Sequence, residues 1–318
     1  MFLSAPRRPR RSAPFVLLPV GVLLLLSVAT CRPAAPSVDR AAALRAYLQA
    51  QPAEVGVSVL SDSGTVFACN DTVRLPLLSV FKFPLAMAVL DRMGRQGTGL
   101  DTLFQLTPDD LREHTYSPLR DRHPTRRAAV RMDSLLIYSV ALSDNNACDV
   151  LLRYVGGPRA VERYVRRLGI RDFSLSATED DMHRDSRRVY DNVASAAAVS
   201  RLFRLLLRDE APVGPYGPFL CRVLEQTSTG ADKLRAGLPA DVRLGHKTGS
   251  SDRRPDGVKV ADNDAGYVVL PDGRRYYITV FVAHSPATDA GNAALIAHVA
   301  REVHALLTAS PPASGAGR

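Results

Sequence analysis

The sequence predicts an α+β fold, in which one antiparallel sheet is built from both ends of the chain and a helical lobe is inserted between them. Alternating segments within residues 54–68 have the two-residue period of strands. Short β-branched and aromatic runs return after residue 245. Between about residues 77 and 224, apolar residues recur at helical spacing. Strands at both ends and helices between them are typical of a single sheet that the two termini share.

The N-terminus has the pattern of an export signal over residues 1–31. A basic start precedes the apolar run 15–26, and small residues lead to Cys31. A single-pass anchor is the alternative, but the run is short for a membrane span and Pro19 interrupts it. The sequence Val28-Ala29-Thr30-Cys31 also resembles a lipoprotein cleavage box, although Thr30 matches it poorly. We therefore expect export to the periplasm, with acylation of Cys31 as an open alternative.

The catalytic domain is expected over residues 32–307, and its first lobe begins at about residues 38–75. Residues 41–50 carry an apolar stripe and predict a helix. Residues 54–60 and 65–68 alternate as two strands around the turn Ser61-Asp62-Ser63-Gly64.

The helical lobe is expected over about residues 76–224. Its helices are predicted at 81–93, 132–142, 147–155, 158–168 and 194–207. Two long irregular stretches separate them, at 115–127 and 174–192.

The last part of the domain, about residues 225–307, returns to the first lobe. It has strands at 245–248, 265–270 and 276–283, with Pro271-Asp272-Gly273 as a turn. A closing helix is expected at 290–307, followed by a flexible tail at 308–318. A cleft between the two lobes is the natural place for a site.

Composition excludes several classes of protein. With 46% apolar and 23% charged residues among 318, the chain is globular rather than disordered. Four of the charges behind its formal +9 lie in the export signal, and the remaining arginines form no basic stripe with interleaved aromatics. Nucleic-acid binding is therefore not expected. The seven histidines show no metal-ligand spacing, so we expect no metal and no organic cofactor.

Three further cysteines, Cys69, Cys148 and Cys221, allow at most one disulfide within the mature body. We interpret each as a small buried hydrophobic residue.

The first chemical motif is Ser79-Val80-Phe81-Lys82. On a helix, positions three apart share a face, so the Lys82 amine lies beside the Ser79 hydroxyl. A serine becomes a nucleophile when a neighbouring base accepts its proton. Free N–H groups at a helix start also suit an oxyanion. By itself, this spacing is better explained by an ordinary capped amphipathic helix.

Two further motifs follow in the order Ser143-Asp144-Asn145 and His246-Lys247-Thr248-Gly249. Ser143 can pass a proton to a leaving nitrogen, and Asn145 can offer its amide, although this motif alone is better explained by a helix N-cap. Lys247 beside Thr248 suits a carboxylate, and Gly249 lets a ligand lie along a strand edge. Together with the first motif, they form the signature set of class A β-lactamases and penicillin-binding proteins.

Glu179 separates these two families. It lies 36 residues past Ser143, inside the irregular stretch 174–192. The chain resembles class A serine β-lactamases over residues 41–307, and that resemblance implies that Glu179 activates the water that hydrolyses the acyl-enzyme. The segments Tyr116-Ser117-Pro118-Leu119-Arg120 and Thr178-Glu179-Asp180-Asp181-Met182-His183 are most similar to the extended-spectrum, PER-like and Bacteroides-type subgroup.

The sequence departs from the common class A pattern at three points. His183 stands where most members have an asparagine, four residues after the glutamate. The ion pair that usually closes the loop is replaced by Ala177 and Asn192. The arginine that commonly assists the Lys247 site is not obvious, with Lys233 and Arg243 as candidates.

The resemblance implies hydrolysis of penicillins and cephalosporins, conferring antibiotic resistance, in a serine β-lactamase/transpeptidase-like fold. Ser79 attacks the lactam, and Lys82, or Glu179 through a water, accepts its proton. The N–H groups of Ser79 and Ser250 form the oxyanion hole, and Tyr116 and His183 contact substrate. We expect a monomer with small-molecule β-lactam substrates. A D,D-peptidase and a penicillin sensor that never turns over are the alternatives.

Overall fold

A computed structural model describes residues 37–309 of the chain. The predicted export signal, Cys31 and the end of the tail therefore lie outside the described residues. The main sheet has five strands in the order β2-β1-β10-β9-β8, all antiparallel to their neighbours. Its strands are β1 (Glu54–Ser61), β2 (Gly64–Cys69), β8 (Arg243–Ser250), β9 (Lys259–Val269) and β10 (Arg275–Ser285).

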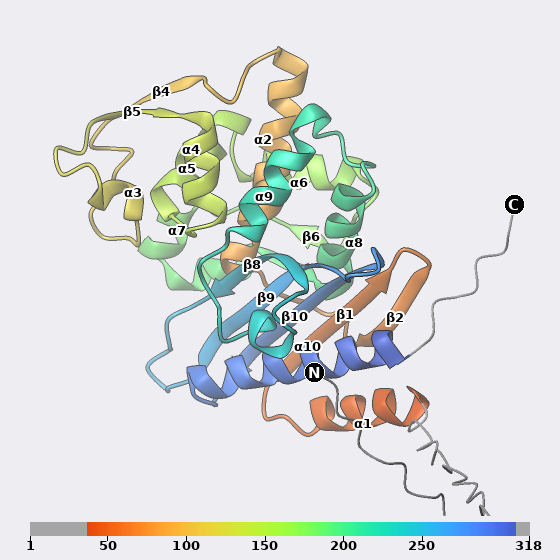
Figure 1. The fold of residues 1–318 in the computed structure, drawn as a ribbon. Coiled ribbons are helices and arrows are strands. Elements are labelled where there is room, and N and C mark those ends of the chain that lie inside the picture. Colours follow the sequence, from red (N-terminus) through yellow and green to blue (C-terminus); the bar gives the residue numbers. More distant parts are fainter. Residues whose placement is uncertain (1–36, 310–318) are drawn as a thin grey trace, which may run out of the picture. The chain divides into compact units, whose positions relative to one another are not determined.

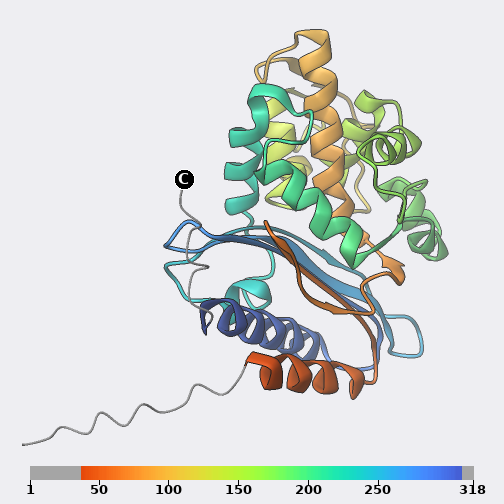
Figure 2. The same cartoon turned by 90° about the vertical axis from the view of Figure 1, so that its right-hand side faces the viewer.

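Both ends of the chain build this sheet, so the α+β prediction is confirmed. Helix α10 (Asp289–Ala309) covers one face, and α1 (Ser37–Gln49) packs on α10. Helix α8 (Ala196–Leu207) covers the opposite face, which is also the side of the helical lobe, as Figures 1 and 2 show. Because both faces are covered, the inner strands β9 and β10 are buried along almost their whole length.

The helical lobe surrounds α2 (Lys82–Gln96), whose residues are buried from Lys82 to Asp91. Around it lie α3 (Pro118–Asp121), α4 (Met132–Val140), α5 (Asn145–Val155), α6 (Pro158–Arg167), α7 (Glu179–Arg184) and α9 (Gly217–Glu225). Four 3-10 turns complete the lobe and its borders: η1 (Leu78–Phe81), η2 (Ser186–Asp191), η3 (Gly214–Tyr216) and η4 (Leu234–Gly237).

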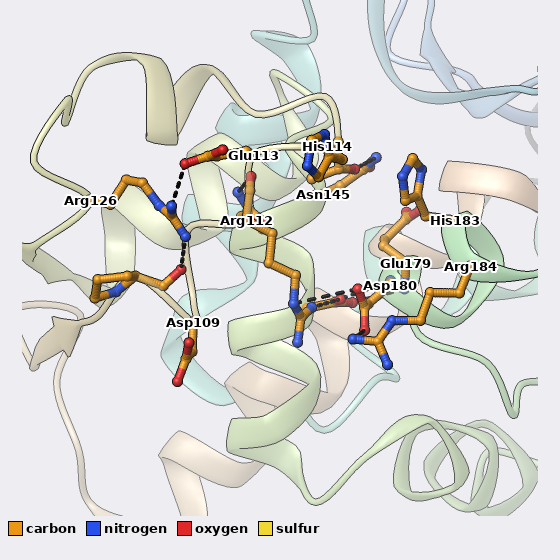
Figure 3. Close-up of a pocket in the computed structure, with 14 residues that line it drawn as sticks. Asp109, Arg112, Glu113, His114, Arg126, Asn145, Glu179, Asp180, His183 and Arg184 are labelled. Carbon is orange, nitrogen blue, oxygen red and sulfur yellow. Dashed lines mark hydrogen bonds and ion pairs between the residues drawn. The ribbon is translucent and has the colours of Figure 1, made fainter.

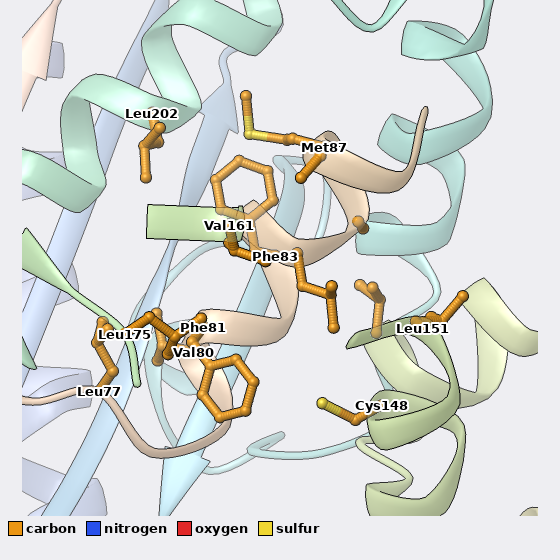
Figure 4. Close-up of a cluster of buried hydrophobic side chains, with 14 of the residues drawn as sticks. Leu77, Val80, Phe81, Phe83, Met87, Cys148, Leu151, Val161, Leu175 and Leu202 are labelled. Carbon is orange, nitrogen blue, oxygen red and sulfur yellow. The ribbon is translucent and has the colours of Figure 1, made fainter. Parts of the chain in front are cut away.

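The principal hydrophobic cluster joins the lobe to the sheet (Figure 4). Phe83 stacks on Phe203 of α8 with ring centroids 3.9 Å apart, and Phe81, Val80 and Leu151 are fully buried. Burial of aromatic and aliphatic side chains at α2 is worth about 1.5–3 kcal/mol each. This packing fixes the residues just before α2, where the first motif lies.

The expectation of irregular stretches at 115–127 and 174–192 was partly wrong, because α3 lies within the first, and α7 and η2 lie within the second. Two small sheets were also not expected. A two-stranded sheet pairs β4 (Leu103–Leu106) with β5 (Ala128–Arg131), and a three-stranded sheet joins β3 (Arg74–Pro76), β7 (Val193–Ser195) and β6 (Phe173–Ser174). Helix α9 was also missed. These strands are too short for periodicity to reveal, because two to four residues do not define a pattern.

The three cysteines within the described residues are free; Cys69 and Cys148 are buried and Cys221 is half-buried. Cys148 packs in the principal cluster, where burial raises the pKa of its thiol well above the ordinary value. No helix in residues 37–309 is long and apolar enough to cross a membrane.

Candidate active site

Ser79 lies in the 3-10 turn η1, which continues directly into α2. Side chains three apart eclipse one another in a 3-10 turn, so Ser79 and Lys82 face the same way. Ser79 is partly exposed, whereas Leu78, Val80 and Phe81 are buried and hold the turn in place. Leu78 has φ 47°, a left-handed conformation that costs a non-glycine residue about 1–3 kcal/mol, directly before the serine.

Lys82 is the centre of the site. Its side chain is fully buried, and Nζ donates to the Ser143 carbonyl at 2.8 Å and to Asn145 Oδ1 at 2.6 Å. Nζ also forms an ion pair with Glu179 Oε1 at 2.9 Å. The structure thus brings Ser143 and Asn145 of the second motif, together with Glu179, to the ammonium group of the first motif.

Charge decides the protonation of Lys82. Burial alone lowers the pKa of a lysine, but the acidic groups around Lys82, with Glu179 first among them, together outweigh burial and raise its pKa. Glu179 Oε1 itself accepts no well-aligned hydrogen bond from the described residues, although it is buried.

The second motif begins with a strained residue and a helix cap. Ser143 has φ 58°, and the carboxylate of buried Asp144 caps α5 by accepting from Ala147 N at 2.8 Å. The N-cap interpretation of this motif therefore holds for Asp144. Asn145 Nδ2 donates to Thr115 Oγ1 at 2.8 Å, which orients the amide whose oxygen holds Lys82.

The third motif lies on the edge strand β8. Lys247 is fully buried, and its Nζ donates to Ser143 Oγ at 3.0 Å and to the Thr248 carbonyl at 2.8 Å. Burial, together with the charge of Lys82, lowers the pKa of Lys247 well below its usual value. Thr248 Oγ1 lies 2.6 Å from Thr229 Oγ1.

Gly249 explains how closely β8 approaches the serine. A Cβ at this position would lie 2.6 Å from the Leu77 carbonyl and 3.1 Å from Ser79 N. Only glycine therefore allows this strand to run against the backbone of the serine turn. Asn263 of β9 fastens the same segment, because its Nδ2 donates to the Pro76 carbonyl at 2.8 Å.

Glu179 is the first residue of α7, and the loop before it is held without the common ion pair. Asn192 is fully buried, and its Oδ1 accepts from Ser176 N and Ala177 N at 3.0 and 2.9 Å. Its Nδ2 donates back to the Ala177 carbonyl at 2.9 Å, and the backbone carbonyl of Asn192 accepts from Leu77 N. The neutral side-chain amide of Asn192 thus closes the loop, and its backbone carbonyl ties the loop to the serine segment.

Asp149, which sequence reasoning missed, holds Glu179 from the other side. Its two carboxylate oxygens accept from Glu179 N at 2.8 Å and Asp180 N at 3.0 Å, at the start of α7. Burial, then the nearby charge of Glu179, raises the pKa of Asp149 to about 6. Asp149 lies four residues after Asn145 on α5, and this helical spacing could have identified it.

The remaining candidates lie at the rim or apart from the site. Tyr116 is 58% exposed, and its carbonyl accepts from Asn145 N. Ser250 and His183 are exposed. Neither candidate for the missing arginine is free: buried Lys233 pairs with Asp262 at 2.5 Å, and Arg243 pairs with Glu225 at 2.7 Å.

A cavity of about 600 Å³ opens beside Glu179 and Asn145 (Figure 3). His114 and His183 are among the residues that line it, and Arg112, also in the lining, pairs with Asp149 and Asp180 at 3.1 and 3.4 Å. No cluster of residues suited to a metal ion occurs in residues 37–309.

Comparison with known proteins agrees with this arrangement. The model of the β-lactamase enzyme family matches residues 39–307. A β-lactamase of Bacteroides uniformis is 45% identical over 258 residues, which are 81% of this chain and 87% of that protein. The extended-spectrum β-lactamase PER-1 of Pseudomonas aeruginosa is 30% identical, over 89% of this chain and 92% of its own.

A solved class A β-lactamase from Bacteroides cellulosilyticus superposes with a TM-score of 0.83 at 44% identity, covering 87% of this chain and 100% of that structure. Family match, identity and fold all agree with the three motifs around Lys82. The chain therefore belongs to the β-lactamase enzyme family, and within it to the class A serine enzymes.

Proposed function

We propose that the protein hydrolyses penicillins and cephalosporins through an ester on Ser79, and thereby confers resistance on its host. This proposal rests on the contacts of the buried Lys82 ammonium, which lies one 3-10 turn from Ser79. Three residues converge on that ammonium: Ser143, Asn145 and Glu179. Hydrolysis of nitrocefin by the purified protein tests it. A D,D-peptidase or a penicillin sensor would be acylated but would give no sustained turnover.

Glu179 is assigned as the base in both halves of the reaction. Because the pKa of Lys82 is raised, its amine is an ammonium and has no lone pair for the Ser79 proton. The Glu179 side chain lines the cavity, from which a water can relay the proton to its carboxylate. In the second half, the same carboxylate takes a proton from the water that attacks the ester carbonyl.

Residues at the edge of β8 are assigned to bind the substrate. Lys247 and Thr248 bind the β-lactam carboxylate, and Ser143, 3.0 Å from Lys247 Nζ, passes a proton to the lactam nitrogen. The N–H groups of Ser79 and Ser250 receive the oxyanion, an arrangement that Gly249 permits. Asn145, Tyr116 and His183 face the rest of the substrate.

Substrate binding is expected to weaken as the pH rises. Lys247 has a lowered pKa in the free enzyme, and a bound carboxylate raises it, so binding takes up a proton above the free-enzyme pKa. The KM for benzylpenicillin should therefore increase, by at most about tenfold per pH unit, when measured from about pH 6 to about pH 10.

Lys247→Arg supplies the control for this pH dependence. A guanidinium stays protonated throughout this range, so the KM of the variant should vary less with pH, even if its value is higher. A flat KM profile in the wild-type enzyme would contradict the assignment of Lys247 to the carboxylate.

Oxyimino-cephalosporins are proposed as substrates, in keeping with the extended-spectrum name of the relative PER-1. The cavity beside Glu179 offers about 600 Å³ for a bulky acyl side chain, and the loop is closed by Asn192 rather than by an ion pair. We expect useful kcat/KM values for cefotaxime-type substrates. His183→Trp, in the cavity lining, should reduce these by about tenfold while sparing benzylpenicillin. A penicillin-only profile in the wild type would refute the proposal.

Export and lipid attachment at Cys31 are also proposed, from the basic and apolar start of the chain. An acylated protein should partition into the detergent phase, and Cys31→Ser should move it to the aqueous phase. Recovery of the wild type only in the soluble periplasmic fraction would rule out the lipid. We further propose that the protein acts as a monomer, as expected from the resemblance to its family.

A further inference from the structure

A second cleft lies between α2 and α6, which pack against each other in the helical lobe (Figure 1). Its volume is about 300 Å³, at the small end of the range for ligand sites. Arg92 and Arg95 lie on α2 ten and thirteen residues beyond Lys82, so the cleft is roughly 15–20 Å along the helix from the catalytic lysine.

The lining of this cleft is strongly cationic. Four arginines face one carboxylate, that of Asp91: Arg92, Arg95, Arg163 and Arg167. Their spacing explains the gathering, since residues three and four apart share a helix face, and the two arginine-bearing faces meet. Two of these arginines already neutralise Asp91, whose Oδ2 lies 2.8 Å from Arg95 and 3.6 Å from Arg167.

The other two arginines have no acidic partner in residues 37–309. The Arg92 guanidinium lies over the Tyr154 ring, 5.1 Å from its centroid, and its Nε donates to Gln96 at 3.4 Å. Arg163 is exposed on α6. Like charges held this close repel one another, and a bound anion would relieve that repulsion.

Tyr164 adds a second, independent observation. This residue lines the cleft, is only 2% exposed, and its hydroxyl has no hydrogen-bond partner among the described residues. A buried hydroxyl without a partner is costly, so such groups usually pair with a protein atom, a water or a ligand. Burial and the charge of Asp91 raise the pKa of Tyr164, which leaves the hydroxyl as a donor.

We propose that the cleft between α2 and α6 binds a phosphate group, which belongs either to inorganic phosphate or to the headgroup of an anionic lipid. Guanidinium groups match phosphate oxygens with paired, charge-assisted hydrogen bonds. Arg92 and Arg163 supply the free charge, and the Tyr164 hydroxyl becomes a further donor once the exposed arginine side chains rearrange around the ligand. The site lies outside the catalytic machinery.

The test compares Arg92→Gln/Arg163→Gln with Arg201→Gln/Arg301→Gln. The control pair removes the same charge from exposed helix positions that have no acidic partner in the described chain. One arm titrates inorganic phosphate and follows amide shifts by NMR. The other sediments the protein with phosphatidylglycerol or phosphatidylcholine vesicles, in a Cys31→Ser background so that no acyl chain contributes.

Loss of two charge-assisted contacts should weaken binding by about tenfold or more in the first pair and hardly at all in the control. Nitrocefin hydrolysis should be unchanged in both. Phosphate shifts that map to α2 and α6 identify the free ion, whereas sedimentation with phosphatidylglycerol alone identifies the lipid. Binding in neither arm, or equal weakening in both variant pairs, would overturn the proposal.

Discussion

Glu179→Gln is expected to give an enzyme that is acylated but hardly turns over. The amide keeps the size and shape of the side chain but removes the base that activates the deacylating water. Acylation survives in part, because without the Glu179 carboxylate burial lowers the pKa of Lys82, whose neutral amine can then accept the Ser79 proton. General-base contributions are typically about 10²- to 10⁴-fold in rate, or about 3–5 kcal/mol of barrier. Nitrocefin should give a burst of one equivalent followed by a slow steady state, and mass spectrometry should find the acyl adduct.

Asp180→Asn is the matched control for this variant. Asp180 lies next to Glu179 on α7 and lines the same cavity, but its carboxylate pairs with Arg184 and Arg112 at 3.0 and 3.4 Å. The same change of charge there should leave turnover within a few-fold of wild type. Wild-type turnover in Glu179→Gln would show that the loop carries no base, and the distinction from a penicillin-binding protein would fail with it.

Ser79→Ala is expected to abolish the covalent adduct and essentially all activity. The variant retains the Lys247 and Thr248 region and so should still bind substrate, but it has no oxygen to form the ester. Loss of the nucleophile in serine hydrolases reduces kcat by about 10⁴- to 10⁶-fold. Mass spectrometry after a brief penicillin pulse should find the adduct on the Ser79 peptide of the wild type only.

The control for Ser79→Ala is Ser186→Ala, which removes an exposed hydroxyl from η2 in the same lobe. This variant should acylate and turn over as the wild type does. An adduct that persists in Ser79→Ala would move the nucleophile elsewhere and remove the basis for the roles of Lys82 and Glu179.

The sequence predicted the architecture well wherever periodicity is long. The helices α2, α5, α6, α8 and α10 and the strands β1 and β10 lie within a few residues of their expected bounds. Apolar residues recur every three to four positions in the helices and every two positions in the strands. These residues form the face that packs in the folded protein, so the pattern in the sequence predicts the element. The three motifs and their order along the chain were also identified from the sequence alone.

Strand β9 shows where a local pattern fails. Only residues 265–270 were expected as a strand, yet β9 begins at Lys259 and passes through Asp262, Asn263 and Asp264, all buried. Charged residues normally indicate a solvated segment. Here they are buried because Lys233 pairs with Asp262, and His246 lies 2.9 Å from Asp264.

The tertiary structure alone decided how the site is held. Asn192 reaches across fifteen residues to Ala177, and Asp149 on α5 accepts the backbone N–H groups of a loop thirty residues away. Ser79, Lys82, Glu179 and Lys247 could be predicted from the sequence because they lie in motifs with a characteristic spacing. The sequence could not show that the acidic groups around Lys82, Glu179 first among them, together outweigh burial and raise its pKa, whereas burial prevails at Lys247. That outcome depends on distances between charges in a buried site, which only packing of the two lobes sets.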